Sequence, residues 1–102
     1  MTYTGPRPVA WDEAKNQENQ RQHGLSFEEA SSLFRSGVDY LEIFDEEHSD
    51  NEERFLAIGP VWQGIILVVW TEQPEDTIRI ISARRATRRE RMLYDSFMRR
   101  KQ

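Results

Sequence analysis

Arginine and lysine side chains are concentrated near the C-terminal end of the sequence. Residues 77–102 carry nine of the fourteen Lys and Arg residues, although the net charge of the chain is −4. These nine are Arg79, Arg84, Arg85, Arg88, Arg89, Arg91, Arg99, Arg100 and Lys101. The segment reads as a strand that runs directly into a helix, so its cations are held on ordered elements and form an anion-binding surface. The anion is either a phosphate backbone or an acidic segment of a partner protein.

A second group of residues could transfer protons. His48 lies in the acidic loop 45–50 between two predicted strands, and its carboxylate neighbours favour the protonated imidazolium, which suits a general acid. Glu53 is a candidate base or orienting partner, and Arg54 follows it directly. A surface histidine without a chemical role is the alternative interpretation of His48.

Composition limits the class of protein. The 102 residues, 37% hydrophobic and 11% aromatic, suffice for one small domain that we expect to span residues 1–102. The absence of cysteine excludes disulfides and thiol nucleophiles, and two histidines far apart in sequence make a metal site unexpected. No cofactor is expected either. The longest apolar run, 65–70, is too short to cross a membrane, and the N-terminus lacks the apolar core of a signal peptide, so we expect a cytoplasmic protein.

Acidic residues dominate the middle of the chain. Between Asp39 and Asp76 there are eleven acids, and the only basic residue is Arg54. Such a run is usually a solvated acidic face. It could also repel nucleic acid from one side of the protein and orient it toward the arginines.

Capping residues predict three helices. Asp12 starts the first, which ends near His23 at Gly24, and this helix has no apolar stripe to bury. Ser26 with Glu29, and Thr87 with Glu90, form Ser/Thr-x-x-Glu capping boxes that begin the second and third helices.

Four strands are predicted between the second and third helices, at about 38–44, 54–58, 65–71 and 77–83. Short links without helices imply an antiparallel meander, and Pro8 to Trp11 is compatible with a short edge strand. The expected fold is α+β, with two N-terminal helices, a four-stranded antiparallel sheet, a C-terminal helix, and the helices covering one sheet face. Alternation along the last strand places Arg79, Ile81 and Ala83 on one face and Ile80, Ser82 and Arg84 on the other.

An ordered set of residues from 11 to 94 carries a family resemblance. The set comprises Trp11-Asp12, Lys15-Asn16, Asn19, His23-Gly24, 26–30, Asp45, His48, Glu53-Arg54, Ile58-Gly59, Val68-Val69, Thr71, 78–84, Ala86-Thr87, Glu90-Arg91 and Tyr94. In this order and at these spacings the sequence resembles the BrnT toxin family. Gln22 departs from the basic residue that commonly precedes the family's His-Gly, and Trp62 and Trp70 lie where the family pattern has no particular aromatic residue.

The resemblance implies a RelE-like ribonuclease that arrests growth by cleaving RNA. It also implies a BrnA-like antitoxin with a ribbon-helix-helix segment, and operator DNA contacted indirectly through that antitoxin. RNA cleavage requires stabilisation of a dianionic phosphorane and transfer of two protons. We assign phosphorane stabilisation to Arg79 and Arg84, with Arg54 next, and proton transfer to His48 and Glu53. A cross-strand pair of Arg79 with Glu53 is the structural alternative.

Further cations are candidates for RNA binding. They are Lys15, His23, Arg88, Arg89 and Arg91. Lys15 could equally be a solvated helix lysine, and His23 could cap the carbonyl groups that end the first helix. The helix arginines could serve solubility or bind the acidic segment of an antitoxin instead.

Two functional hypotheses follow. The first is an endoribonuclease toxin neutralised by its antitoxin, acting without a metal ion. The second is a non-catalytic module that docks a DNA-binding antitoxin and acts with it as a co-repressor.

Overall fold

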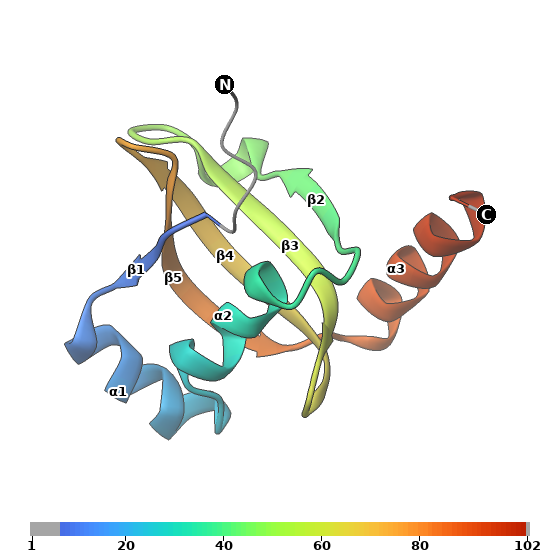
Figure 1. Ribbon diagram of the computed structural model, residues 1–102, viewed down its shortest axis with the longest axis horizontal. Helices are drawn as coiled ribbons and strands as arrows, with labels where there is room; N and C mark the ends of the chain where they lie inside the picture. The colour runs from blue at the N-terminus through green and yellow to red at the C-terminus, as the bar shows by residue number, and fades with distance from the viewer. Residues whose placement is uncertain (1–6, 102) are drawn as a thin grey trace.

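The structure is a computed structural model that describes residues 7–101 (Figure 1). Its elements in chain order are β1 (Val9–Trp11), α1 (Glu13–His23), α2 (Phe27–Arg35), β2 (Leu41–Phe44), the short 3-10 helix η1 (Glu46–His48), β3 (Arg54–Val61), β4 (Gly64–Gln73), β5 (Thr77–Arg85) and α3 (Arg88–Arg100). The three predicted helices and their order along the chain are therefore confirmed. The expectation about a signal peptide concerns a stretch whose first six residues lie outside the described part.

The sheet has five strands in the order β1-β5-β4-β3-β2. Strands β2 to β5 form the predicted antiparallel meander, but β1 adds to β5 in parallel, so the prediction of a four-stranded antiparallel sheet is wrong. The parallel strand covers the outer edge of β5, where the backbone groups of Ile78 and its neighbours would otherwise lack partners. Pro8 has no N–H to donate, yet its carbonyl accepts from Ile78 N at 2.9 Å. The sheet is thus mixed.

Helices cover both faces of the sheet, which corrects the prediction that they cover one. Helices α1 and α2 lie on one face, where Phe27 and Leu33 pack with Val68 and Trp70 of β4. Helix α3 leaves the end of β5 and lies apart from α1 and α2 (Figure 1). Its Tyr94 and Met98 pack on the other face of the sheet, against Ile58, Leu67 and their neighbours. The link from β5 to α3 is only two residues long, and it carries the chain to the side of the sheet opposite α1 and α2. Strand β4 is apolar on both faces because it is the central strand.

Helix α1 is held by polar side chains, which explains its lack of an apolar stripe. Asn16 and Asn19 are buried, at 6% and 5% exposure. Asn16 Oδ1 accepts from Phe27 N at 2.8 Å and so fixes the start of α2. Asn19 Nδ2 donates to the carbonyls of Leu25 and Ala83, both at 2.8 Å, and its Oδ1 accepts from Ala83 N at 3.1 Å. A single amide therefore pairs with β5 just beyond the point where β1 ends.

Strand β5 contains an irregularity that changes the direction of its side chains. Val69 pairs with Ser82 and Trp70 with Ile80, so Ile81 has no partner on β4. As a result Ile78, Ile80 and Ala83 all face the core beneath α1 and α2. The predicted simple alternation along this strand is therefore wrong. An extra residue shifts every following side chain to the opposite face.

No helix within residues 7–101 is long and apolar enough to cross a membrane.

Candidate active site

A hollow of about 390 Å³ lies on the face of the sheet that carries α3. Its floor is apolar and comes from Leu56 of β3 and from Leu67 and Val69 of β4. Polar side chains surround that floor, and they come from four separate elements: Asp45, Glu47 and His48 around η1, Arg54 of β3, Ser82 and Arg84 of β5, and Glu90 of α3. Arginines, a histidine and carboxylates thus converge on one concave surface, as phosphodiester chemistry requires.

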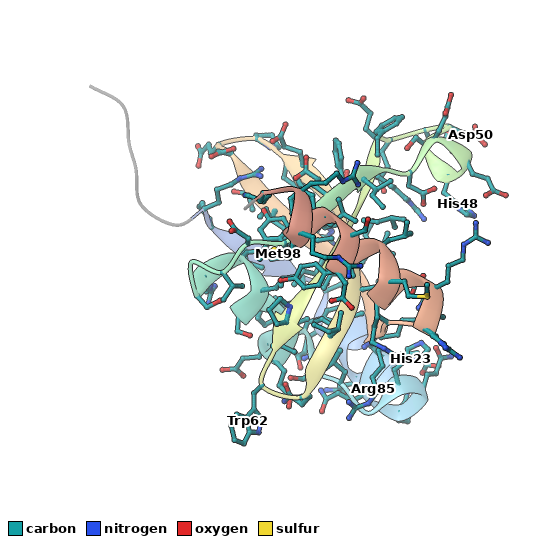
Figure 2. All side chains as sticks on the ribbon, turned by 90° about the vertical axis from the view of Figure 1, so that its right-hand side faces the viewer. His23, His48, Asp50, Trp62, Arg85 and Met98 are labelled. Atoms are coloured by element: carbon teal, nitrogen blue, oxygen red, sulfur yellow. The ribbon has the colours of Figure 1, made fainter. Side chains whose placement is uncertain are left out.

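His48 is oriented by the acidic loop that carries it. Its Nδ1 lies 3.0 Å from Asp45 Oδ2, and Asp45 N donates to the Arg54 carbonyl at 2.8 Å, which ties the loop to β3. Because Nδ1 faces the carboxylate, the proton on that nitrogen is directed to Asp45 and Nε2 is left for a substrate. Figure 2 shows His48 beside the turn that carries Asp50. The ring is exposed, and it lines the hollow together with Arg54.

Arg54 has unsatisfied donors. Its Nε is buried and has no hydrogen-bond partner within residues 7–101. Its closest carboxylate contact there is Nη2 to Glu52 Oε1 at 3.8 Å, which is too long for a hydrogen bond. The backbone N of Arg54 donates to Ser49 Oγ at 3.0 Å, so the residue itself is well anchored. An arginine with an anchored backbone, whose guanidinium makes no hydrogen bond to a carboxylate within residues 7–101, is suited to an incoming anion.

Arg84, by contrast, is already paired. Its Nη1 and Nη2 donate to Glu90 Oε1 and Oε2 at 2.8 and 2.9 Å, a bidentate ion pair that joins β5 to the start of α3. The Glu90 carboxylate raises the pKa of Arg84, and the Arg84 guanidinium holds the pKa of Glu90 below its usual value. Glu90 also accepts from Thr87 N, completing the predicted capping box. Arg84 therefore contributes to the hollow as a neutralised cation.

Arg79 lies on the same sheet face as the hollow but outside its lining. Arg54, Thr71 and Arg79 are in register across three adjacent strands, so their side chains share one face. Two strand spacings, roughly 10 Å, separate the Arg54 and Arg79 backbones. Within the described part of the chain no carboxylate lies within ion-pairing distance of Arg79, and the alternative pairing with Glu53 is not formed.

Glu53 and Glu47 differ in their access to the hollow. The side chain of Glu53 does not line it; this residue instead accepts a 2.7 Å hydrogen bond from Thr71 Oγ1 through its carbonyl. Glu47, which sequence reasoning missed, lines the hollow and the adjoining depression beside His48 and Arg54. The position of Glu47 directly before His48 was the available signal, but six acids in that loop and its neighbours made the choice ambiguous.

The first helix brings two of the predicted RNA-binding residues to the other side of β5. Lys15 and His23 line a smaller hollow of about 150 Å³ together with Ile81 and Ser82. Ile81 and Ser82 also line the larger hollow, so the irregular part of β5 is shared by both. In Figure 2, His23 lies at the end of α1, well away from His48. The two hollows together give a longer path across β5 than either gives alone.

The remaining predicted RNA-binding residues are exposed on α3. Arg88 and Arg89 make no ion pair among residues 7–101, whereas Arg91 donates to the Ala86 carbonyl at 3.1 Å and so supports the start of the helix. None of the three lines the larger hollow.

Removal of the Glu90 charge should reveal how much the ion pair contributes to stability. We expect Glu90→Gln to lower the free energy of unfolding at neutral pH by about 1 kcal/mol, a small value because the Arg84 side chain is 39% exposed. The folded-state pKa of Glu90 is lowered, so its stabilisation is complete above the ordinary value of 4.5 and is lost as pH falls through the lowered pKa. Urea unfolding near neutral pH and again near pH 3 should therefore show the difference between the two proteins shrinking at the lower pH. A difference that stays constant with pH would contradict the ion-pair explanation.

Comparison with known proteins gives a consistent result. The family model of BrnT, described as the ribonuclease toxin of a type II toxin–antitoxin system, matches residues 11–90. The crystal structure of the Brucella abortus ribonuclease toxin BrnT is 26% identical in sequence and covers 80% of this chain and 99% of its own, with a TM-score of 0.59. No curated protein sequence matches the chain. The family match includes the residues that line both hollows. On the extent of that match, the chain belongs to the BrnT family of ribonuclease toxins from type II toxin–antitoxin systems.

Proposed function

We propose that this chain is an endoribonuclease that cleaves RNA without a metal ion. The observation that carries the proposal is that one hollow is lined by both Arg54 and His48. The buried Nε of Arg54 has no partner within residues 7–101, and Asp45 orients the His48 ring. A phosphodiester placed above the apolar floor would meet a cation and a proton carrier at once. The family to which the chain belongs supports RNA as the substrate.

Each step of the reaction can be assigned to a residue. The 2′-oxygen attacks phosphorus as its proton passes to a carboxylate, for which Glu47 is better placed than Glu53. Arg54 stabilises the charge that develops on the non-bridging oxygens, and Arg79, on the same face, supports the neighbouring phosphate. His48 protonates the departing 5′-oxygen from Nε2 while Asp45 holds the ring. The bond from phosphorus to the 5′-oxygen breaks, leaving a 2′,3′-cyclic phosphate and a 5′-hydroxyl.

RNA beyond the cleaved bond would follow the path across β5. Lys15 and His23 lie on that path beside Ser82 and can contact a flanking phosphate. Arg88, Arg89 and Arg91 of α3 add sequence-independent attraction, and Arg84, neutralised by Glu90, orients the start of α3 at the edge of the hollow.

We further propose that a BrnA-like antitoxin with a ribbon-helix-helix segment neutralises the enzyme and carries the pair to operator DNA. On this proposal the chain forms a single RelE-like domain and works in the cytoplasm.

Cleavage by the purified chain in EDTA tests this proposal. We expect a labelled single-stranded RNA to be cut, with cyclic phosphate ends, and the same sequence made of DNA to stay intact because it lacks the attacking 2′-hydroxyl. A parallel reaction with ribosomes and messenger RNA covers a substrate that is presented only during translation. Cleavage that requires a divalent metal or leaves a 3′-hydroxyl would overturn the mechanism. Folded protein with no cleavage in either reaction would favour the non-catalytic co-repressor.

A further inference from the structure

The outer face of α3 combines exposed apolar residues with arginines. Met92 and Leu93 are 61% and 45% exposed, whereas Tyr94 of the same helix is buried. Together with Arg89, Ser96 and Arg99 they line a depression of about 360 Å³, with Asp95 at its margin. We call these residues, Arg89, Met92, Leu93, Asp95, Ser96 and Arg99, the α3 patch. A depression with an aliphatic centre is a feature of interaction surfaces rather than of freely solvated helices.

The charge around the α3 patch has one predominant sign. Arg89 and Arg99 line the depression, and Arg88 and Arg100 are their exposed neighbours along α3. None of these four arginines makes an ion pair within residues 7–101. Asp95 is the only acid among the residues that line the depression. Arg89 and Arg99 are ten residues apart, which places them roughly 15 Å apart along the helix axis. The surface therefore offers cations at both ends and apolar contact between them.

We propose that the α3 patch is the docking surface for an acidic, amphipathic segment of the antitoxin, with apolar residues at its centre and carboxylates near both ends. The identity of the partner as an antitoxin rests on the proposed function; the chemistry of the segment rests on charge complementarity with the patch. Among other occupants, a second copy of this chain in a symmetric dimer would bring arginines against arginines. RNA would meet no aromatic ring in the depression on which a base could stack.

The α3 patch lies next to the candidate active site, so a segment that binds the patch would also affect RNA cleavage. Arg89 lies in the patch, and the next residue, Glu90, lines the larger hollow and pairs with Arg84. A segment bound along α3 therefore ends beside the candidate active site, where its carboxylates would compete with phosphate for Arg54. Binding of a segment to the α3 patch would therefore also inhibit the enzyme, because one turn of α3 contributes to both the patch and the larger hollow.

Binding of a designed peptide to the full chain tests the proposal. The probe is a fluorescein-labelled helical peptide of about four turns, with leucines along one face and glutamates near both ends of that face. We expect it to bind the wild-type protein in a fluorescence anisotropy titration. Leu93→Ser and Arg99→Glu should each raise the dissociation constant about tenfold or more. A peptide whose glutamate at one end is replaced by lysine should regain affinity for the Arg99→Glu protein.

Trp62→Ser serves as the matched control. Trp62 is 95% exposed at the turn between β3 and β4 and projects away from the rest of the protein (Figure 2). Its removal takes away more exposed apolar surface than Leu93→Ser does, yet it should leave peptide binding unchanged. Equal binding by wild type, Leu93→Ser and Arg99→Glu would overturn the proposal. The proposal would also be overturned if single-stranded RNA displaced the peptide and Leu93→Ser weakened the binding of that RNA. A dimer that light scattering detects in the wild type and not in Leu93→Ser would overturn it as well.

The two proposals fail separately. Peptide binding that depends on Leu93 and Arg99, in a protein that cuts no RNA, would support the docking surface and remove the proposed enzyme function. If the protein cleaves RNA but both substitutions leave peptide binding unchanged, the enzyme function would be supported and the docking surface would be removed. Neither side chain lines the candidate active site, so Leu93→Ser should cleave RNA at the wild-type rate.

Discussion

Replacement of Asn19 by alanine is expected to lower the free energy of unfolding by about 3 kcal/mol, because it leaves several buried groups unpaired. The carbonyls of Leu25 and Ala83 and the N–H of Ala83 all hydrogen-bond to this one side chain. Leu25 and Ala83 are themselves buried, so water cannot replace the lost partners without rearrangement. Urea unfolding with linear extrapolation measures the difference.

Gln17→Ala is the matched control for Asn19. Gln17 lies on the exposed side of the same helix, so its loss should change the free energy of unfolding by less than about 0.5 kcal/mol. A comparable loss in both variants would show that helix propensity, rather than the paired amide, is responsible. Asn19 also holds β5 directly after Ile81 and Ser82, which line the larger hollow. Any Asn19→Ala protein that remains folded should therefore also cleave RNA more slowly.

The second large effect is expected on catalysis. Arg54→Ala should lower the single-turnover cleavage rate by about 10²- to 10³-fold, because it removes the cation that faces developing charge on phosphorus. Within the described residues the guanidinium makes no side-chain hydrogen bond that the fold would lose, since Nε has no partner and Glu52 Oε1 is 3.8 Å from Nη2. Stability should therefore fall much less than the rate does.

Arg35→Ala removes an equal charge from a different place. Arg35 is exposed at the end of α2, on the opposite face of the sheet from the hollow. Its removal should leave the cleavage rate within about twofold of wild type, since at ordinary ionic strength a distant exposed charge is screened. An equal loss in both arginine variants would mean that net charge, and not position, governs the reaction.

Much of the fold follows from local signals in the sequence. Ser26 with Glu29, and Thr87 with Glu90, predicted two helix starts because a capping box satisfies backbone donors within four residues. Gly24 predicted the end of α1 because glycine adopts the left-handed conformation that ends many helices, and its φ in the structure is 66°. The features that the sequence did not predict depend on contacts between distant residues. Strand β1 pairs in parallel with β5 across more than 65 positions, and no short-range pattern encodes that choice.

The candidate site was predicted only in part for the same reason. His48 and Arg54 lie together as expected, because a loop of only five residues separates the end of η1 from the start of β3. The pairing of Arg84 with Glu90 was missed, although both residues had been singled out, because the bidentate contact depends on how α3 leaves the strand. The face of Arg79 was assigned incorrectly relative to Ala83, since one unpaired residue, Ile81, shifts the alternation. Asn16 and Asn19 belong to the set of residues that resembles the BrnT family, but no local pattern indicates the buried hydrogen bonds that they make to α2 and β5.

Cleavage of an RNA with sulfur in place of the 5′-bridging oxygen tests most directly whether His48 and Arg54 act together at one phosphate. A thiolate leaves without being protonated, so a variant that lacks only the proton donor should recover on this substrate. On ordinary RNA, His48→Gln and Arg54→Ala should both be slower than wild type by about 10²-fold or more. On the sulfur-bridged RNA, His48→Gln should return to within about tenfold of wild type while Arg54→Ala should stay slow, because phosphorane charge still needs a cation. Wild-type rates for both variants on ordinary RNA would contradict the assignment of the reaction to this hollow.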